Sequence, residues 1–107
     1  MTNLTPRDLR TWLDNATRAQ PILLDVREEW EFATCRIEGS TLIPMREVQT
    51  RWDELDPQAE VVVICHHGVR SFHVAQFLER EGFARVYNLS SGVDGWARQV
   101  DPAMPVY

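Results

Sequence analysis

The chain has 107 residues, a length that suits one domain with a modest core. It carries 16 acidic and 11 basic residues, and the formal charge of -5 argues against nonspecific nucleic-acid or acidic-membrane partners, which would repel it. No segment reads as a membrane-spanning helix, and residues 1–9 lack the pattern of a secretory signal. We therefore expect a single cytoplasmic domain over residues 1–107.

The first quarter of the chain predicts a helix followed by a buried strand. Thr5-Pro6, with Asp8 behind it, has the capping hydroxyl, the proline and the first-turn carboxylate of a helix start. Residues 22–26 form an apolar run that is consistent with a buried strand. The charged residues Asp25 and Arg27 at the end of that run are interpreted as a structural pair, because buried charges need partners.

The pattern continues to alternate on both sides of the centre of the chain. Residues 28–32 have a helical pattern, residues 41–44 form a brief extended segment ended by a proline, and apolar spacing predicts a helix over residues 47–55. Residues 85–89 read as a last strand, and residues 90–96 as a glycine-bearing turn that enters a short terminal helix.

The central segment has the clearest pattern. Residues 61–64 are apolar and almost wholly β-branched without polar alternation, which is typical of a strand buried on both faces of a parallel sheet. From Ser71 onward the apolar spacing is helical, and Gly82 followed by Phe83 reads as a glycine cap. Strands and helices thus alternate, which predicts an α/β fold with a mainly parallel sheet and a site beyond the carboxyl ends of the strands.

Cys65 follows the central strand directly and faces the start of the next helix. Loop amides and the unpaired first-turn amides of a helix favour an anion at such a place, and Arg70 adds positive charge. Both stabilise a thiolate, so Cys65 is a candidate nucleophile. The ordinary alternative is a small buried residue that ends a strand, but packing explains poorly why Gly68 and Arg70 follow it.

Four segments of the chain resemble a single-domain rhodanese. They are Asp25-Val26-Arg27; Glu31-Phe32 through Arg36-Ile37-Glu38-Gly39-Ser40 to Ile43-Pro44; Cys65-His66-His67-Gly68-Val69-Arg70-Ser71; and Asn88-Leu89-Ser90-Ser91-Gly92-Val93-Asp94-Gly95-Trp96. The spacing from the cysteine to the arginine is a weak signal alone, but four segments in the right order around a predicted strand, loop and helix make a strong one.

The resemblance implies a five-stranded, mainly parallel sheet flanked by helices on both faces, and sulfurtransferase activity. Cys65 would carry a sulfur atom as a persulfide, taken from a donor such as thiosulfate and passed to an acceptor such as cyanide or a thiol. The loop residues would form its pocket and Arg70 would attract the anionic donor; these residues are His66, His67, Gly68, Val69 and Arg70. A protein sulfur acceptor also fits, and no cofactor is expected.

Two positions depart from the family pattern. Cys35-Arg36 stands where the family more often has glycine and histidine, so Cys35 is either a second reactive thiol that resolves the persulfide or, as is more usual, an inert buried residue. Ser91 stands where glycine is frequent, which matters only if that position needs a positive φ. No metal is expected, because His66 and His67 are adjacent and cannot easily turn both rings to one ion.

Two other functions remain as alternatives. A cysteine phosphatase or arsenate reductase uses the same kind of anion-binding loop, but such phosphatases have five residues between cysteine and arginine, whereas Cys65 and Arg70 have four between them. A rhodanese-like binding or regulatory module without turnover is the second alternative. Such modules commonly lack the cysteine, and here Cys65, Gly68 and Arg70 are all present.

Overall fold

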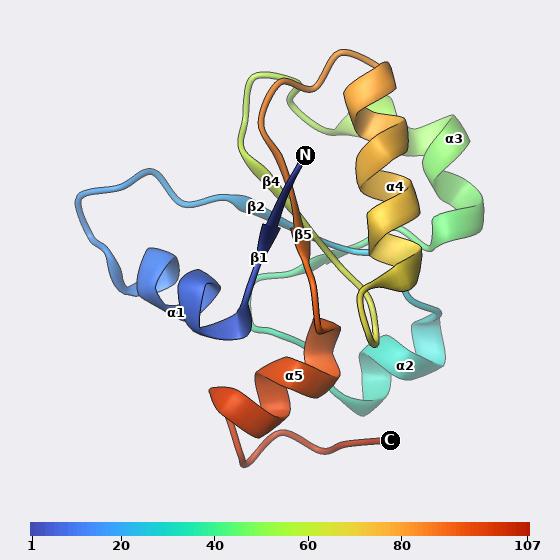
Figure 1. Ribbon diagram of the computed structural model, residues 1–107. Helices are drawn as coiled ribbons and strands as arrows, with labels where there is room; N and C mark the ends of the chain where they lie inside the picture. The colour runs from blue at the N-terminus through green and yellow to red at the C-terminus, as the bar shows by residue number, and fades with distance from the viewer.

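The computed structural model describes residues 1–107, and its centre is one parallel sheet of five strands in the order β1-β5-β4-β2-β3. Every neighbouring pair of strands is parallel. The strands run close together through the middle of the molecule (Figure 1). Their bounds are β1 Thr2–Leu4, β2 Ile22–Asp25, β3 Thr41–Leu42, β4 Val61–Ile64 and β5 Val86–Leu89.

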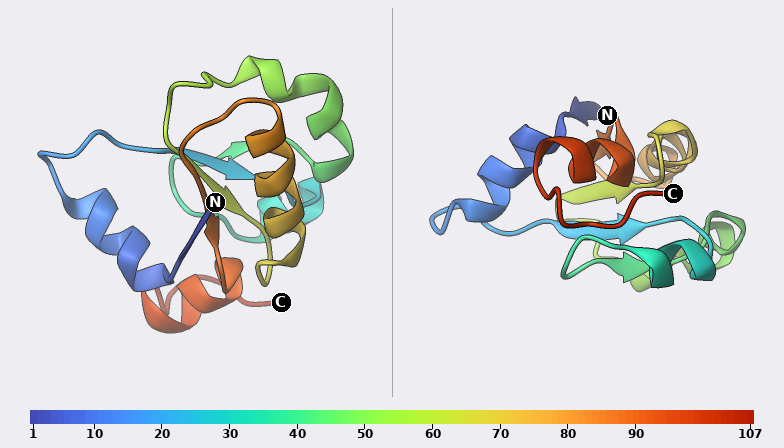
Figure 2. Two further views of the ribbon diagram at one scale, coloured as in Figure 1. Left: turned by 45° about the horizontal axis from the view of Figure 1, so that its top comes forward. Right: turned by 90° about the horizontal axis from the view of Figure 1, so that it is seen from below.

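Helices cover both faces of this sheet, as the views in Figure 2 show. One core is built from side chains of α1 and α5 against the sheet, and the other from side chains of α3 and α4. The shorter α2 lies near the C-terminal end of the chain (Figure 1). The helices are α1 Pro6–Asp14, α2 Glu29–Thr34, α3 Val48–Arg51, α4 Val69–Arg80 and α5 Gly92–Gln99, with short 3-10 turns at Met45–Glu47 and Trp52–Glu54.

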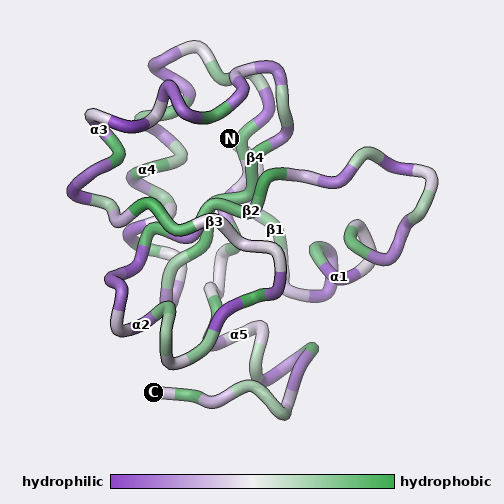
Figure 3. Tube along the Cα trace, turned by 180° about the vertical axis from the view of Figure 1, so that it is seen from behind, coloured by the Kyte–Doolittle hydropathy of each residue, from purple (hydrophilic) through white to green (hydrophobic).

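The central strand β4 is apolar throughout because it faces both cores. Val61 and Val63 pack in the core on the α4 face, while Val62 and Ile64 pack in the core on the α1 face. Successive side chains of a strand point to opposite faces, so a run without polar alternation is needed here. The hydrophobic colouring of β2 and β4 in Figure 3 shows the same feature. The predicted α/β class with helices on both faces is confirmed.

Two helix ends form as the sequence predicts. Thr5 accepts a hydrogen bond from the Asp8 amide and the Asp8 carboxylate accepts one from the Thr5 amide, which is a capping box. At the end of α4, Gly82 has φ 100°, and the Phe83 amide donates to the Leu78 carbonyl at 3.1 Å. These are the bonds of a Schellman motif, in which a left-handed glycine closes the helix.

Two elements differ from the sequence-based expectation. The strand β1 was not predicted, because Thr2-Asn3-Leu4 has a single apolar residue and pairs only at the sheet edge with β5. The helix predicted over residues 47–55 is instead one α-helical turn, α3, between two 3-10 turns. Such short turns keep the buried side chains of Val48 and Leu55 in the core without a continuous helix. None of the helices has the length and apolar character needed to cross a membrane.

Leu78→Ala tests the anchoring of α4 to the sheet. Leu78 is fully buried, so the substitution should lower the free energy of unfolding by about 2 to 5 kcal/mol through lost burial and a cavity. Urea unfolding followed by circular dichroism measures this loss. Gln76→Ala, at an exposed position of the same helix, should change stability by less than about 0.5 kcal/mol; equal losses would show that α4 is not anchored through Leu78.

Candidate active site

Cys65 lies between the end of β4 and the start of α4, at the carboxyl edge of the sheet. Its side chain is almost fully buried, with 1% of the residue exposed. The Gly68 amide donates a hydrogen bond to Cys65 Sγ at 3.0 Å, and Ser71 Oγ lies 3.3 Å from the same sulfur. The sulfur is therefore held at a helix start, where backbone amides favour negative charge.

Gly68 is required by the backbone of this loop. It occupies the capping position of α4 with φ 102°, in the left-handed region. A Cβ atom there would lie 2.1 Å from the Ser90 carbonyl oxygen, a backbone atom that cannot turn away. Only glycine allows the loop to aim its amide at Cys65 Sγ against the neighbouring turn. The turn after Cys65 therefore explains why glycine stands at position 68.

The start of α5 holds the other side of the loop through the backbone. The Val93 amide donates to the Cys65 carbonyl at 2.9 Å, and the Asp94 amide donates to the His66 carbonyl at 3.1 Å. Gly92 has φ 61°, and a Cβ atom there would lie 2.3 Å from the His66 carbonyl oxygen. Ser91 has φ -109°, so this position does not need glycine and the departure from the family pattern leaves the turn intact.

Arg70 is bound to a carboxylate that the sequence analysis did not assign to the site. Its Nη1 and Nη2 atoms donate to Glu31 Oε1 at 2.7 Å and to Glu31 Oε2 at 2.8 Å, and its side chain is 32% exposed. The hydrogen bond from Arg70 lowers the pKa of Glu31 to about 2, and the same bond raises the pKa of Arg70. The Glu31 carboxylate therefore balances much of the positive charge of Arg70. No hydrogen bond joins Arg70 to Cys65.

Tyr107 in the C-terminal segment completes this network. Its hydroxyl donates to Glu31 Oε2 at 2.7 Å and accepts from Arg27 Nη1 at 2.9 Å. Its ring stacks on His66 with a centroid distance of 3.9 Å, and burial raises the pKa of Tyr107 to about 12. The polar role of Tyr107 has no signal in the sequence of the irregular tail.

The predicted structural pair of Asp25 and Arg27 is confirmed. Both side chains are fully buried, and Arg27 Nη2 donates to Asp25 Oδ2 at 2.8 Å. Arg27 also donates to the backbone carbonyls of Glu31 at 3.2 Å and Cys35 at 2.6 Å. The pair therefore fixes the end of β2 to the Glu31 carbonyl of α2 and to the residue that caps its C-terminal end.

Cys35 and Cys65 are not bonded to each other. Cys35 is buried in the core on the α1 face, and Cys65 packs in the core on the α4 face. A disulfide between them would require one thiol to leave its core, which favours the interpretation of Cys35 as an inert residue.

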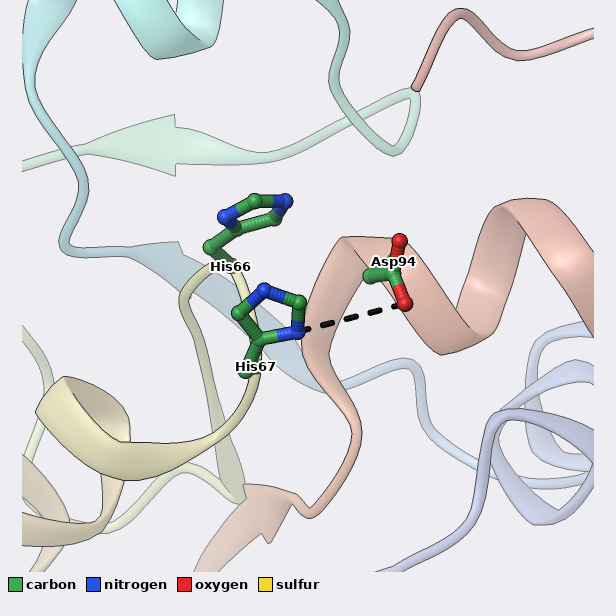
Figure 4. A group of neighbouring side chains, drawn as sticks. All are labelled: His66, His67 and Asp94. Carbon is green, nitrogen blue, oxygen red and sulfur yellow. Dashed lines mark ion pairs between the residues drawn. The ribbon is translucent and has the colours of Figure 1, made fainter. Parts of the chain in front are cut away.

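His66 and His67 differ in their surroundings, as Figure 4 shows. His67 is 62% exposed, and its Nδ1 lies 3.9 Å from Asp94 Oδ2. His66 is less exposed, and its burial lowers the pKa of its ring below the ordinary value of 6.5. One ligand atom from each ring and from Asp94 lie within 4.8 Å of one another. Adjacency therefore does not keep the two rings apart, but Asp94 is already paired with Arg98 at 3.0 Å. That no metal binds here stays a prediction.

The pairing of Glu31 with Arg70 predicts a loss of stability in acid. Because the pKa of Glu31 falls from 4.5 to about 2 on folding, its contribution is complete above pH 4.5 and is lost as pH falls toward about 2. Glu31→Gln should lower the free energy of unfolding by about 1 to 2 kcal/mol near neutral pH. That difference should shrink in acid when urea unfolding is measured across this range.

The control for this measurement is Glu38→Gln, which changes an exposed carboxylate without an ion pair. It should have little effect at any pH. A Glu31→Gln difference that stays constant down to about pH 2 would contradict the role given to the ion pair.

Gly92→Ala tests the backbone contact that holds the cysteine loop. The new Cβ atom would clash with the carbonyl oxygens of both Cys65 and His66, so we expect a loss of about 2 to 4 kcal/mol in unfolding free energy. The rate at which iodoacetamide alkylates Cys65 should also differ from the rate in the wild-type protein. Gly82→Ala is the control, because its φ is 100° but no atom lies within 4 Å. It should cost about 1 kcal/mol and leave alkylation unchanged; equal effects of the two would refute the argument.

Comparisons with known proteins show which sequences this chain is similar to. Over 101 residues the chain is 33% identical to the thiosulfate sulfurtransferase GlpE of Glaesserella parasuis, covering 94% of this chain and 91% of that protein. It is 36% identical over 90 residues to the rhodanese-like/PpiC domain-containing protein 12 of Arabidopsis thaliana, covering 79% of this chain but only 30% of that protein. The chain thus spans less than a third of that longer relative.

A solved structure extends the similarity over the whole chain, and a family model matches most of it. The crystal structure of a rhodanese-like domain protein from Staphylococcus aureus superimposes with a TM-score of 0.84 at 25% identity, covering 100% of this chain and 99% of that one. The model of the rhodanese-like domain matches residues 5–99. The chain therefore belongs to the rhodanese-like domain family.

Proposed function

We propose that this chain is a sulfurtransferase that carries a sulfur atom as a persulfide on Cys65. One observation carries the proposal: a buried cysteine sulfur at the start of α4 accepts a hydrogen bond from the Gly68 amide at 3.0 Å. An amide in this position stabilises a negatively charged sulfur. The similarity to the thiosulfate sulfurtransferase GlpE supports the same activity.

The reaction needs two displacement steps at sulfur. In the first, the Cys65 thiolate attacks the outer sulfur of thiosulfate, and the sulfur–sulfur bond of thiosulfate breaks so that sulfite leaves with the electron pair. In the second, an acceptor such as cyanide or a thiolate attacks the outer sulfur of the persulfide and releases the Cys65 thiolate. Thiocyanate or a new persulfide is the product, and the protein ends in its starting state.

The loop backbone has the main electrostatic role in this proposal. The amide of Gly68 already contacts the sulfur in the folded loop, so it requires no reorganisation during the reaction. Arg70 attracts an anionic donor less strongly than a free arginine, because Glu31 binds its guanidinium through both carboxylate oxygens. The exposed third of the Arg70 side chain is the part that a donor meets. We propose that His66, His67 and Val69, which belong to the same loop, also contact the donor.

The geometry favours sulfur transfer over the two alternatives. Four residues between Cys65 and Arg70 make a ring narrower than the five-residue loop of cysteine phosphatases. A binding module without turnover has no use for a buried cysteine that accepts a backbone hydrogen bond. In a reducing compartment such as the cytoplasm the thiol stays available, so we propose small sulfur compounds, or a protein thiol for which thiosulfate is a surrogate, as partners.

Intact mass spectrometry after incubation with thiosulfate tests this function. Wild type and Cys35→Ser should gain one sulfur atom and lose it when cyanide is added, since Cys65 is present in both. Cys65→Ser should gain nothing. Cys35→Ser is the matched control, because it removes the other thiol of the chain, which is also buried.

Each result has a clear meaning. Sulfur on Cys65→Ser, or none on Cys35→Ser, would move the carrier role to Cys35. Failure of all three proteins to take up sulfur would reject thiosulfate as the donor, and a phosphatase assay would then examine the alternative.

A further inference from the structure

Asn88 on β5 joins two groups that contact the Cys65 sulfur, although it does not contact the sulfur itself. It is 3% exposed. Its side chain accepts a hydrogen bond from the Ser71 hydroxyl and donates one to the Gly68 carbonyl at 3.2 Å. Ser71 Oγ lies 3.3 Å from Cys65 Sγ, and the Gly68 amide binds the same atom. Asn88 therefore supports the sulfur site from a different strand.

The hydrogen-bond partners fix the orientation of the Asn88 amide. Its Nδ2 faces the Gly68 carbonyl oxygen and also donates to Asn3 Oδ1 at 3.1 Å. A backbone carbonyl only accepts hydrogen bonds, so the nitrogen must face it and Oδ1 must face Ser71. Because an amide oxygen also only accepts, the Ser71 hydroxyl is the donor. Asn88 thus uses the single hydroxyl proton of Ser71.

This arrangement makes Asn88 and the sulfur compete for one proton. While Ser71 donates to Asn88, its oxygen offers only lone pairs to Cys65 Sγ. A thiol can donate its S–H to those lone pairs, but a thiolate cannot. For Ser71 to stabilise the thiolate, its hydroxyl must turn to the sulfur and leave Asn88 Oδ1 without a donor, which costs free energy in a buried site.

We propose that Asn88 is a positioning residue that sets the protonation of Cys65 through the direction of the Ser71 hydroxyl. In the resting protein the hydroxyl points to Asn88 and offers the sulfur only lone pairs. When the sulfur loses its proton, the hydroxyl turns to it. The role of this switch in catalysis rests on the proposed function, but the protonation of Cys65 is measured without sulfur transfer, so the two proposals fail separately.

Other ionisable groups around the loop are separate from this switch. None of them forms a hydrogen bond with Ser71 or Asn88, so substitutions at these two positions leave their contacts in place. They come from the loop, α4, α2, α5 and the C-terminal segment, and they are His66, His67, Arg70, Glu31, Asp94 and Tyr107.

A double-mutant cycle tests the proposal in a Cys35→Ser background, where Cys65 is the only thiol. The pH dependence of iodoacetamide alkylation gives the acid dissociation constant of Cys65. Asn88→Leu removes the acceptor and frees the Ser71 hydroxyl for the thiolate, so this constant should rise by about three- to tenfold. In Ser71→Ala protein, where no hydroxyl is present, adding Asn88→Leu should leave the constant unchanged.

Asn3→Ala is the matched control, because it removes a partner of the Asn88 nitrogen and leaves Ser71 and Gly68 in place. It should leave the dissociation constant unchanged. The proposal is overturned if Asn88→Leu acts equally with and without Ser71, since Asn88 would then act through Gly68. It is also overturned if Asn88→Leu has no effect in either background.

A measurement that leaves Asn88 in place keeps the proposal testable if Asn88→Leu does not fold. The Raman S–H stretching band of Cys65, recorded in Cys35→Ser at a pH where Cys65 is a thiol, should have the lowered frequency of a hydrogen-bonded S–H group. In Ser71→Ala it should shift to the frequency of a free thiol. The same frequency in both proteins would contradict donation by the thiol to Ser71.

Discussion

The placement of one sulfur atom against a backbone amide is the constraint on which this site depends. The loop after β4 must turn tightly enough for the Gly68 amide to reach Cys65 Sγ, and this turn brings its backbone against Ser90. The start of α5 then approaches the loop carbonyls from the other side, where Gly92 leaves no room for a Cβ atom. Two glycines in the left-handed region therefore determine where the sulfur lies.

A chain of charged and polar side chains surrounds this loop without contacting the sulfur. The buried pair of Asp25 and Arg27 leads through Tyr107 to Glu31 and from there to Arg70. Each ion has at least one partner of opposite charge or a hydroxyl, as charges removed from water require. The network joins β2, α2, the C-terminal segment and α4, whereas the hydrogen-bond contacts of the sulfur come from the Gly68 amide and the Ser71 hydroxyl.

Features that depend on neighbouring residues could be predicted from the sequence. The buried strand at residues 61–64, the capping box at Thr5 and the glycine cap at Gly82 formed as expected, because strand periodicity and helix capping are decided within a few residues. The same holds for Cys65 and Gly68, since a strand, a turn and a helix start in succession place them at the carboxyl edge of the sheet.

The sequence by itself thus determined the fold class, the position of Cys65 and the shape of its loop, all of which follow from local periodicity and local turn geometry. Only the tertiary structure decided which side chains surround them. Glu31 meets Arg70 across 39 positions and Tyr107 meets Glu31 across 76, and Asn88 reaches Ser71 from a different strand. Such pairings depend on the order of strands in the sheet and on the path of an irregular segment, neither of which has a local pattern.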